Sequence, residues 1–257
     1  MKKSNVLFNS IIILTIIFSE DLYAQKITIL TEHLAPFQVV NEKSISGIST
    51  EIVEATLKEA NYEYEIAAYP WSLSFNRAKH EKNTCIYSLS RIPEREPLFE
   101  WVGHIISSTI SLYSLASKQI AIKNLNDAKK YKTAVIRDDV THHFLLSKGF
   151  IENENLYVMD NYDSLLKLLE IPNRNIDLVV INDDLIYNRV KSTEAASKYK
   201  NVYNMRELTL NFHLACSLNT EKNIITQLKK SMKKLEQHGD LSAIRKKWRS
   251  TMMNILD

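Results

Sequence analysis

Arg95 is the side chain whose type and position best suit it to hold a small anion. It lies in a charged, proline-containing loop, residues 91–97, that follows a predicted strand at residues 84–87. A guanidinium is always charged, and its planar fork can meet a carboxylate with two parallel hydrogen bonds. Arg95 could therefore bind the carboxylate of a captured molecule, or it could form a surface ion pair with a neighbouring glutamate. These neighbours are Glu94, Glu96 and Glu100.

Two other groupings could do different chemistry. Glu32 or His33, which follow the first predicted strand, could act as a general acid on a substrate. His142 and His143 lie near two aspartates, but adjacent residues on a helix point about 100° apart and seldom bind one ion together. We therefore interpret both histidines as solvated or capping side chains. The chain has four glycines and no Gly-rich phosphate-binding loop. We expect no metal and no cofactor, and we favour binding over catalysis, with no catalytic residue.

The elements that must position these residues form two α/β units. In the first unit the pattern predicts strands at residues 26–30, 62–66 and 84–87, with a helix that begins near residue 49 and another near residues 73–79. In the second unit it predicts strands at residues 133–136, 156–159 and 176–181, with helices at residues 142–148 and 163–170. Strands that alternate with helices favour a largely parallel sheet covered by helices.

Two extended segments, residues 105–117 and 208–218, would carry the chain from the first unit to the second and back. After the second of these segments, apolar residues at helical spacing predict two carboxyl-terminal helices. We therefore divide the chain into residues 1–24 as a signal peptide, 25–110 as the first part of lobe 1, and 111–207 as lobe 2. Residues 208–257 supply a return strand and the carboxyl-terminal helices, which pack on lobe 1.

The first residues are typical of a signal peptide. Two lysines precede an apolar stretch at residues 6–18, and Ala24 provides a small residue for cleavage before Gln25. The stretch is shorter than the roughly 20 apolar residues of a membrane span, and no cysteine precedes Cys85 to carry a lipid. We expect a secreted, periplasmic protein that is cleaved near Ala24.

Composition narrows the class of protein. A hydrophobic share of 45% supports a folded core, and a net charge of +3 is too small for a nucleic-acid-binding surface. Cys85 and Cys216 are the only cysteines, and both lie in apolar runs. An oxidising compartment would permit a disulfide, but we interpret each cysteine as a small buried hydrophobe.

Several blocks of sequence, in order, resemble the family 3 extracellular solute-binding proteins, the polar amino-acid receptors of ABC importers. The blocks are residues 31–37, 47–52, 69–71, 88–95, 99–101 and 235–248. The resemblance implies an α/β, two-lobed periplasmic-binding-protein type II (Venus flytrap) fold with two hinge strands. It also implies a monomer that binds a small carboxylate-bearing solute, such as a polar or basic amino acid, and delivers it to a membrane ABC permease. The alternatives are a ligand-sensing partner of a membrane signalling protein and a dehydratase-like enzyme on the same fold.

The resemblance also implies roles for individual residues. Arg95 would grip the ligand's carboxylate, Ser88 and Ser90 would offer hydroxyl and backbone groups to it, and Glu32 would meet a cationic ligand side chain. Trp71 could form an aromatic wall of the pocket or belong to the core. The full set of expected ligand-binding residues is Glu32, Phe37, Trp71, Arg77, Ser88, Ser90, Arg91, Arg95, Arg137, Asp139, Thr141 and Asn182.

The sequence departs from the family's pattern in lobe 2 and at one position of lobe 1. Residues 137–141 replace a Gly-Thr-Thr-like turn with a turn that contains two aspartates. Asn182 stands where relatives place an aspartate for the ligand's ammonium group, and Leu34 stands where they often place an aromatic ring. The ligand could therefore be an amino acid or a carboxylate without an amino group.

Overall fold

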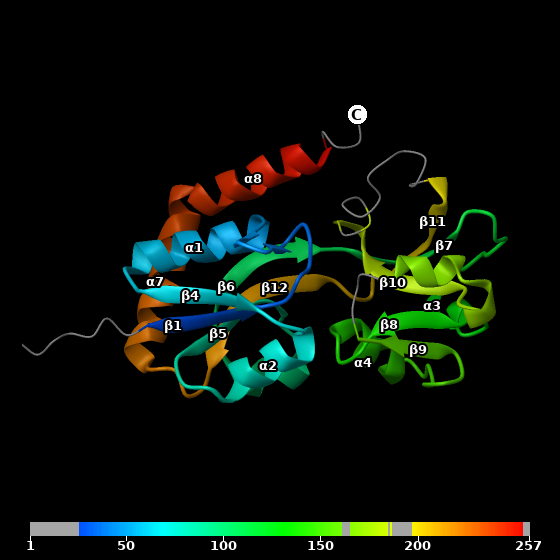
Figure 1. The fold of residues 1–257 in the computed structure, drawn as a ribbon, viewed down its shortest axis with the longest axis horizontal. Helices are drawn as coiled ribbons and strands as arrows, with labels where there is room; N and C mark the ends of the chain where they lie inside the picture. The colour runs from blue at the N-terminus through cyan, green and yellow to red at the C-terminus, as the bar shows by residue number, and fades with distance from the viewer. Residues whose placement is uncertain (1–25, 161–164, 185, 187–196, 254–257) are drawn as a thin grey trace, which may run out of the picture.

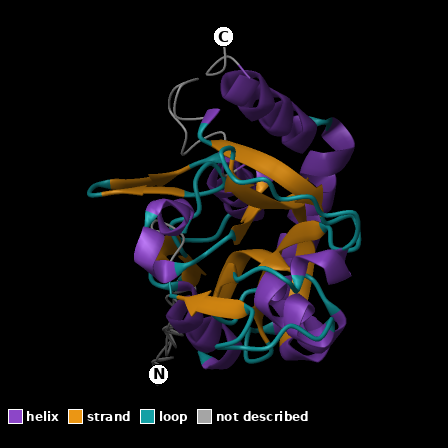
Figure 2. Cartoon of the chain, turned by 90° about the vertical axis from the view of Figure 1, so that its right-hand side faces the viewer, coloured by secondary structure: helices purple, strands orange, loops and turns teal. Residues whose placement is uncertain are grey.

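Two five-stranded β-sheets, each flanked by helices, form two lobes (Figures 1 and 2). The computed structural model describes residues 26–160, 165–184, 186 and 197–253, so the expected signal peptide at residues 1–24 lies outside the described residues. Within the described part of the chain, no helix has the length and apolar character needed to cross a membrane.

Lobe 1 is built on a sheet with the strand order β4-β1-β5-β12-β6. Its strands are β1 (Ile27–Thr31), β4 (Tyr64–Ala68), β5 (Thr84–Ser90), β6 (Phe99–Ser108) and β12 (Leu210–Ser217). Strand β1 pairs in parallel with β4 and β5, whereas β12 pairs antiparallel with β5 and β6. The helices of this lobe are α1 (Ile48–Ala60), α2 (Trp71–His80), α7 (Lys222–His238) and α8 (Asp240–Met253), and a small hairpin is formed by β2 (Val39–Asn41) and β3 (Ser44–Ser46).

Helix α1 forms where the sequence predicts it, because Ile52, Val53 and Leu57 recur at helical spacing and are fully buried. Its entry requires Gly47, which has a φ of 115° and lies against the preceding loop. A Cβ atom at this position would lie 2.4 Å from the carbonyl oxygen of Phe37. The glycine therefore fixes how the loop after β1 returns to the helix.

Lobe 2 is built on a sheet with the strand order β11-β7-β10-β8-β9. Its strands are β7 (Ile110–Leu115), β8 (Thr133–Ile136), β9 (Leu156–Met159), β10 (Leu178–Asn182) and β11 (Tyr199–Asn204). Strand β8 pairs in parallel with β9 and β10, and β10 is buried along its whole length, as its continuous apolar run predicts. The helices are α3 (Leu125–Ala128), α4 (Val140–Ser147), and the 3₁₀ turns η2 (Leu166–Glu170) and η3 (Pro172–Arg174).

The chain crosses between the two sheets at Thr109 and again at residues 205–209. The crossings contact each other, because the Met205 N–H donates to the Ile110 carbonyl at 2.9 Å. Two carboxylates of lobe 2 hold the first crossing. Asp183 accepts from the Thr109 hydroxyl at 2.5 Å, and Asp184 accepts from the Ser108 hydroxyl at 2.6 Å. The two aspartates beside Asn182 are thus bonded to the hinge.

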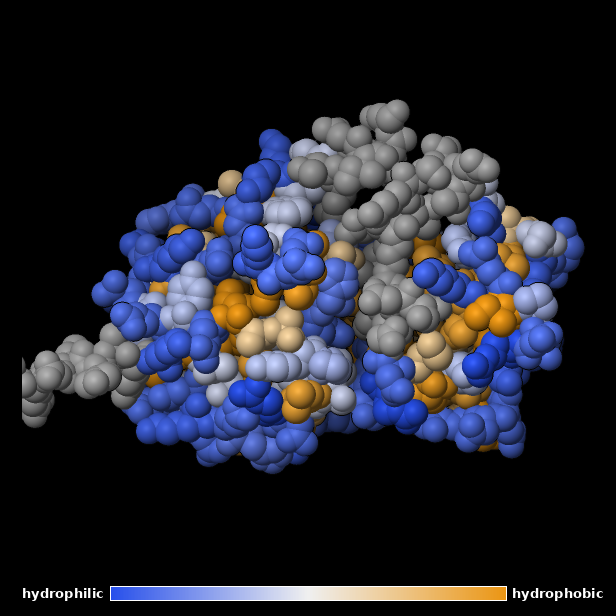
Figure 3. Space-filling model, in the orientation of Figure 1, coloured by the Kyte–Doolittle hydropathy of each residue, from blue (hydrophilic) through white to orange (hydrophobic). Residues whose placement is uncertain are grey.

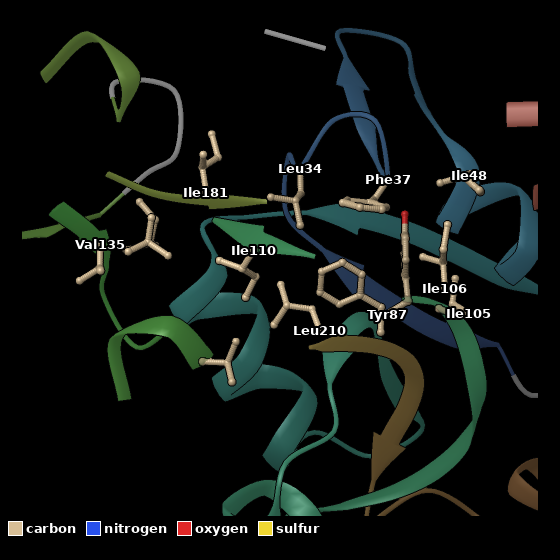
Figure 4. Packing of buried hydrophobic residues seen from close by; sticks show 14 of the residues in the cluster. Leu34, Phe37, Ile48, Tyr87, Ile105, Ile106, Ile110, Val135, Ile181 and Leu210 are labelled. Atoms are coloured by element: carbon tan, nitrogen blue, oxygen red, sulfur yellow. The ribbon is translucent and has the colours of Figure 1, made fainter. Parts of the chain in front are cut away.

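The hydrophobic core continues from one lobe to the other through this hinge. Figure 4 shows Leu34, Ile110 and Leu210 lying between Tyr87 of lobe 1 and Val135 of lobe 2. Along the face drawn in Figure 3, hydrophilic side chains cover much of the surface and hydrophobic ones form patches on both lobes. The lobes therefore meet through apolar packing at the hinge as well as through the two crossings.

Cys85 and Cys216 form a disulfide, so our interpretation of them as separate buried thiols was wrong. They face each other as register partners on the neighbouring strands β5 and β12. The sequence conceals this pairing, because the cysteines are 131 residues apart and the whole of lobe 2 lies between them.

Two predicted elements differ from the observed ones. Residues 105–117 carry the chain from lobe 1 to lobe 2 as predicted, but they do so as two strands, since β6 ends at Ser108, β7 begins at Ile110 and the two join different sheets. Of the helix predicted at residues 163–170, the first two residues lie outside the described residues, and Leu166–Glu170 form the 3₁₀ helix η2. Pro172 follows within two residues and prevents this turn from continuing as a longer helix.

Candidate ligand-binding site

A small buried cavity lies between the lobes at the carboxyl ends of β1, β5 and β8. This is the edge where open α/β sheets bind ligands. Its lining residues are Glu32, Leu34, Trp71, Ser88, Ser90, Arg95, Ile136, Asp139, Leu210 and Phe212. The cavity measures about 20 Å³, enough for about one water molecule. The lobes are therefore in close contact around it.

Arg95 lies at the centre of this contact. It belongs to the 3₁₀ helix η1 (Pro93–Leu98) and is only 6% exposed. Its guanidinium donates to the Ser90 carbonyl at 3.4 Å and, across the interface, to the Asp138 carbonyl of lobe 2 at 3.2 Å. The same group lies 5.2 Å from the ring centre of Phe75 and 5.5 Å from that of Trp71.

The alternative role for Arg95, a surface ion pair with Glu94, Glu96 or Glu100, does not fit its burial, because the residue is only 6% exposed. Glu96 bonds to Arg91, and Glu100 pairs with Lys222 and Lys229. A buried guanidinium needs strong acceptors to offset its lost hydration. The Ser90 and Asp138 carbonyls are neutral acceptors, and Arg95 also has a further interaction within the protein. A carboxylate is a stronger acceptor for a guanidinium fork than a neutral carbonyl.

Ser88 lines the cavity at an irregularity in the pairing of strand β5. Its φ is 56°, a left-handed conformation that is uncommon outside glycine. The pairing of β5 with β12 shifts register between His213 and Ala215, opposite this residue. The Ser88 hydroxyl donates to Oε1 of the fully buried Gln38 at 3.0 Å. Left-handed backbone of this kind is concentrated at functional sites, so the conformation of Ser88 supports its place in the candidate site.

The lobe 2 side of the cavity is a turn that His142 holds in place. Asp138 has a φ of 57°, and its N–H donates to His142 Nδ1 at 3.2 Å. His142 Nε2 lies 3.0 Å from Glu152 Oε1. Nδ1 must therefore be unprotonated, while Nε2 carries the proton given to Glu152. His142 caps the turn as expected, but it is buried at 4% exposure rather than solvated.

Charges of both signs line the cavity. Arg95 supplies a cation, and Glu32 and Asp139 supply two carboxylates. Each of these three groups has partners within the protein. A molecule that carries both a carboxylate and a positive group matches this lining better than a purely anionic one.

Among the residues expected from the sequence, Glu32, Trp71, Ser88, Ser90, Arg95 and Asp139 line this cavity. The other arginines do not, because each pairs with a nearby acid. Arg77 bonds to Glu81 at 2.7 Å, and Arg137 bonds to Asp160 at 2.9 Å. The hydrogen bond with Glu81 raises the pKa of Arg77. Arg91 likewise forms an ion pair with Glu96, to which its Nε donates at 2.8 Å.

The remaining expected residues are buried and do not line the cavity. Phe37 packs edge-on against Phe212, with ring centres 5.0 Å apart. Thr141 is buried in the first turn of α4. Asn182 ends β10 opposite Ile110 of β7.

Sequence reasoning did not predict most of the apolar residues that line the cavity. Leu34 was noted only as a departure from the family pattern, while Ile136, Leu210 and Phe212 were not singled out. All lie at or just beyond strand ends. Nothing in their residue types distinguishes them from the core that they adjoin.

Comparison with known proteins agrees with this architecture. The family model for bacterial extracellular solute-binding proteins, family 3, matches residues 27–251. A search of curated proteins found no relative of the chain.

Three solved structures illustrate the shared fold. A histidine kinase sensor domain with similarity to periplasmic binding proteins is 16% identical, with a TM-score of 0.77 over 87% of this chain and 96% of that one. An ancestral arginine-binding protein bound to arginine is 15% identical, with a TM-score of 0.75 over 87% and 97% of the two chains. The arginine-, lysine-, histidine-binding protein ArtJ from Geobacillus stearothermophilus is 17% identical, with a TM-score of 0.69 over 87% and 95%.

The two-lobed α/β fold predicted from the sequence is confirmed by these matches. Because the family model spans nearly all of the described residues, the chain belongs to family 3 of the bacterial extracellular solute-binding proteins.

Proposed function

We propose that this protein is a periplasmic, non-enzymatic receptor that closes its lobes on an amino acid and delivers it to a membrane ABC importer. The observation that carries this proposal is the burial of Arg95 at the junction, where its guanidinium bonds to Asp138 of the opposite lobe. A ligand carboxylate would be a stronger acceptor for this guanidinium than the Ser90 and Asp138 carbonyls. Glu32 and Asp139 would then face the ligand's ammonium group.

Ligand entry requires the lobes to separate. The cavity of about 20 Å³ holds about one water molecule, so it must widen before an amino acid can enter. The crossings at Thr109 and at residues 205–209 are the places where the backbone can change direction. A ligand that contacts both lobes stabilises the closed state because it binds that state more tightly.

Replacement of Arg95 tests this proposal. We expect Arg95→Ala to weaken amino-acid binding by about 2–5 kcal/mol, the usual cost of truncating one partner of a desolvated charge pair. A thermal-shift screen of amino acids and small organic acids would first identify the ligand, because a ligand of the folded state raises the melting temperature. Isothermal titration would then compare the variants.

The matched control is Arg91→Ala, which lies in the same loop and pairs with Glu96 outside the cavity. We expect it to leave affinity unchanged. Equal affinities for the Arg95→Ala variant and the unaltered protein would remove Arg95 from the site and, with it, the proposed function.

A sensory role is a second candidate, favoured by the likeness to the histidine kinase sensor domain. Binding would then regulate a membrane kinase instead of supplying an importer. Uptake of the labelled ligand by cells that lack this protein separates the two roles. Loss of uptake supports delivery to an importer, whereas unchanged uptake favours sensing.

Catalysis of the dehydratase type is a weaker alternative, because the two acid candidates lie in different environments. Glu32 lines the cavity, but His33 is exposed and its Nδ1 accepts the Val40 N–H at 3.0 Å. We therefore propose binding without chemistry. Incubation with prephenate-like substrates, followed by product absorbance, would detect turnover if it occurred.

A further inference from the structure

A second and much larger cavity adjoins Arg95 and Trp71. It measures about 740 Å³, within the range of roughly 300–1,000 Å³ that is usual for ligand pockets. Helix α2 and the 3₁₀ helix η1 of lobe 1 line one side, and α4 of lobe 2 lines the other. Figure 1 shows that α2 and α4 lie on facing sides of the two lobes. We call this cavity the α2–α4 groove. Its lining also includes Phe75, Asn76, Glu94, Leu98, Phe144 and Ser147.

The groove has apolar side chains on both sides. Phe75 and Leu98 belong to lobe 1, Phe144 belongs to lobe 2, and all three are only partly buried. Partly exposed aromatic and aliphatic groups that gather in a concave space indicate a binding surface for an apolar molecule. Because both lobes contribute, an occupant would contact both and favour their closure.

The α2–α4 groove and the small cavity share one charged residue, Arg95. Arg95 lines both spaces, and its guanidinium lies over the rings of Phe75 and Trp71, which also line the groove. A carboxylate at Arg95 would thus leave an attached apolar group beside these rings. A ligand confined to the small cavity has about 20 Å³, whereas one that extends into the groove has about 740 Å³ more.

We infer that the α2–α4 groove binds the aromatic or branched apolar side chain of an amino acid whose carboxylate lies at Arg95. This inference rests on the proposed function, and it replaces the polar or basic side chain implied by the family resemblance with an apolar one. The ammonium group remains beside Glu32 and Asp139.

Isothermal titration of the full secreted protein with L-phenylalanine, L-arginine and glycine tests the ligand class. We expect L-phenylalanine to bind at least about tenfold more tightly than glycine, because burial of its ring removes a large apolar area from water. We also expect it to bind more tightly than L-arginine. Equal affinity for L-phenylalanine and glycine would overturn the inference.

Filling the groove tests its location. Asn76 is exposed on α2 and lines the groove, so Asn76→Trp should reduce the affinity for L-phenylalanine about tenfold or more and leave glycine binding unchanged. The control is Leu73→Trp, on the same helix at a position that is 45% exposed and outside the lining. Ser147→Trp fills the groove from α4 and provides a second variant if Asn76→Trp misfolds.

The outcomes separate this inference from the proposed function. Glycine binding that depends on Arg95, with no effect of either filling variant on L-phenylalanine, overturns the groove and retains the carboxylate site. L-phenylalanine binding that survives Arg95→Ala overturns the placement of its carboxylate and thus the inference. Absence of binding by every amino acid, with a neutral Arg95→Ala variant, overturns the proposed function itself.

Discussion

At the scale of single residues, the structure assigns a positioning role to His142. Its imidazole accepts the N–H of Asp138, whose carbonyl accepts from Arg95 across the lobe interface. We expect His142→Phe to keep a ring in this buried place but to leave the Asp138 N–H without its acceptor. The free energy that stabilises the closed state should fall by about 1–3 kcal/mol, the usual cost of leaving a buried donor without an acceptor. Titration of the identified ligand at neutral pH measures this loss as weaker binding.

The variant Glu152→Gln is the matched control for His142. Its side-chain oxygen can still accept from His142 Nε2, so binding should change much less. If His142→Phe lowers only the free energy of unfolding and not the affinity, the histidine stabilises lobe 2 without positioning the turn against Arg95.

Sequence reasoning at this scale put Arg95 first and identified several other cavity-lining positions, but it also included Arg77, Arg91 and Arg137, which do not line the cavity. Arg77 and Glu81 are four residues apart on α2, so their ion pair could have been predicted from helical spacing. Arg137 and Asp160 are 23 residues apart, at the ends of β8 and β9, and only the parallel pairing of these strands brings them together. The apolar residues that line the cavity were missed for a related reason, because only the folded arrangement of the strands brings them to the same place.

At the scale of elements, the two strands that lead to the hinge carry a pair of histidines with a predictable response to pH. His213 of β12 and His104 of β6 are register partners, with ring centres 5.3 Å apart. The pKa of His213 is lowered overall, mainly by burial and also by the nearby His104 and Arg91. A hydrogen bond to Asn211 and the charge of Glu96 raise it, but by less. The unfolded chain therefore binds a proton more readily than the folded one.

The free energy of unfolding should consequently fall as the pH decreases below about 6.5, the ordinary pKa of histidine. Above that pH the contribution of His213 to stability is fully present. Urea unfolding at about pH 7.5 and about pH 5.5 measures this change in the free energy of unfolding. Both pH values lie above the ordinary pKa values of aspartate and glutamate, so carboxylates contribute little to the change. His213→Gln should reduce this dependence, whereas His80→Gln on α2 should retain it. A pH response that is the same in all three proteins would contradict the assignment.

Most strands and helices were predictable from hydrophobic periodicity, but their partners were not. The apolar run of β10 and the spacing of α1 are local signals. The break at Thr109 is not local, since β6 continues along β12 while β7 pairs with β10 and β11. The edge strand β11 was missed because its sequence, Tyr199–Asn204, alternates little and contains two asparagines and a lysine.

At the scale of the whole molecule, the disulfide links two strands of lobe 1 and encloses all of lobe 2 in a covalent loop. The fold class was predictable from the alternation of strands and helices, but the pairing of cysteines 131 residues apart was not.

Closure of so long a loop restricts the unfolded chain, so the double variant Cys85→Ala and Cys216→Ala should lose about 2–5 kcal/mol of stability. Both cysteines are fully buried and neither lines the ligand cavity. The variant should therefore unfold at lower urea concentration and bind its ligand with unchanged affinity under conditions where it remains folded. Unfolding of the unaltered protein with and without a reductant provides the control, because the reductant should lower its midpoint and leave that of the double variant in place. Equal midpoints for the two proteins without reductant would show that this bond adds no stability.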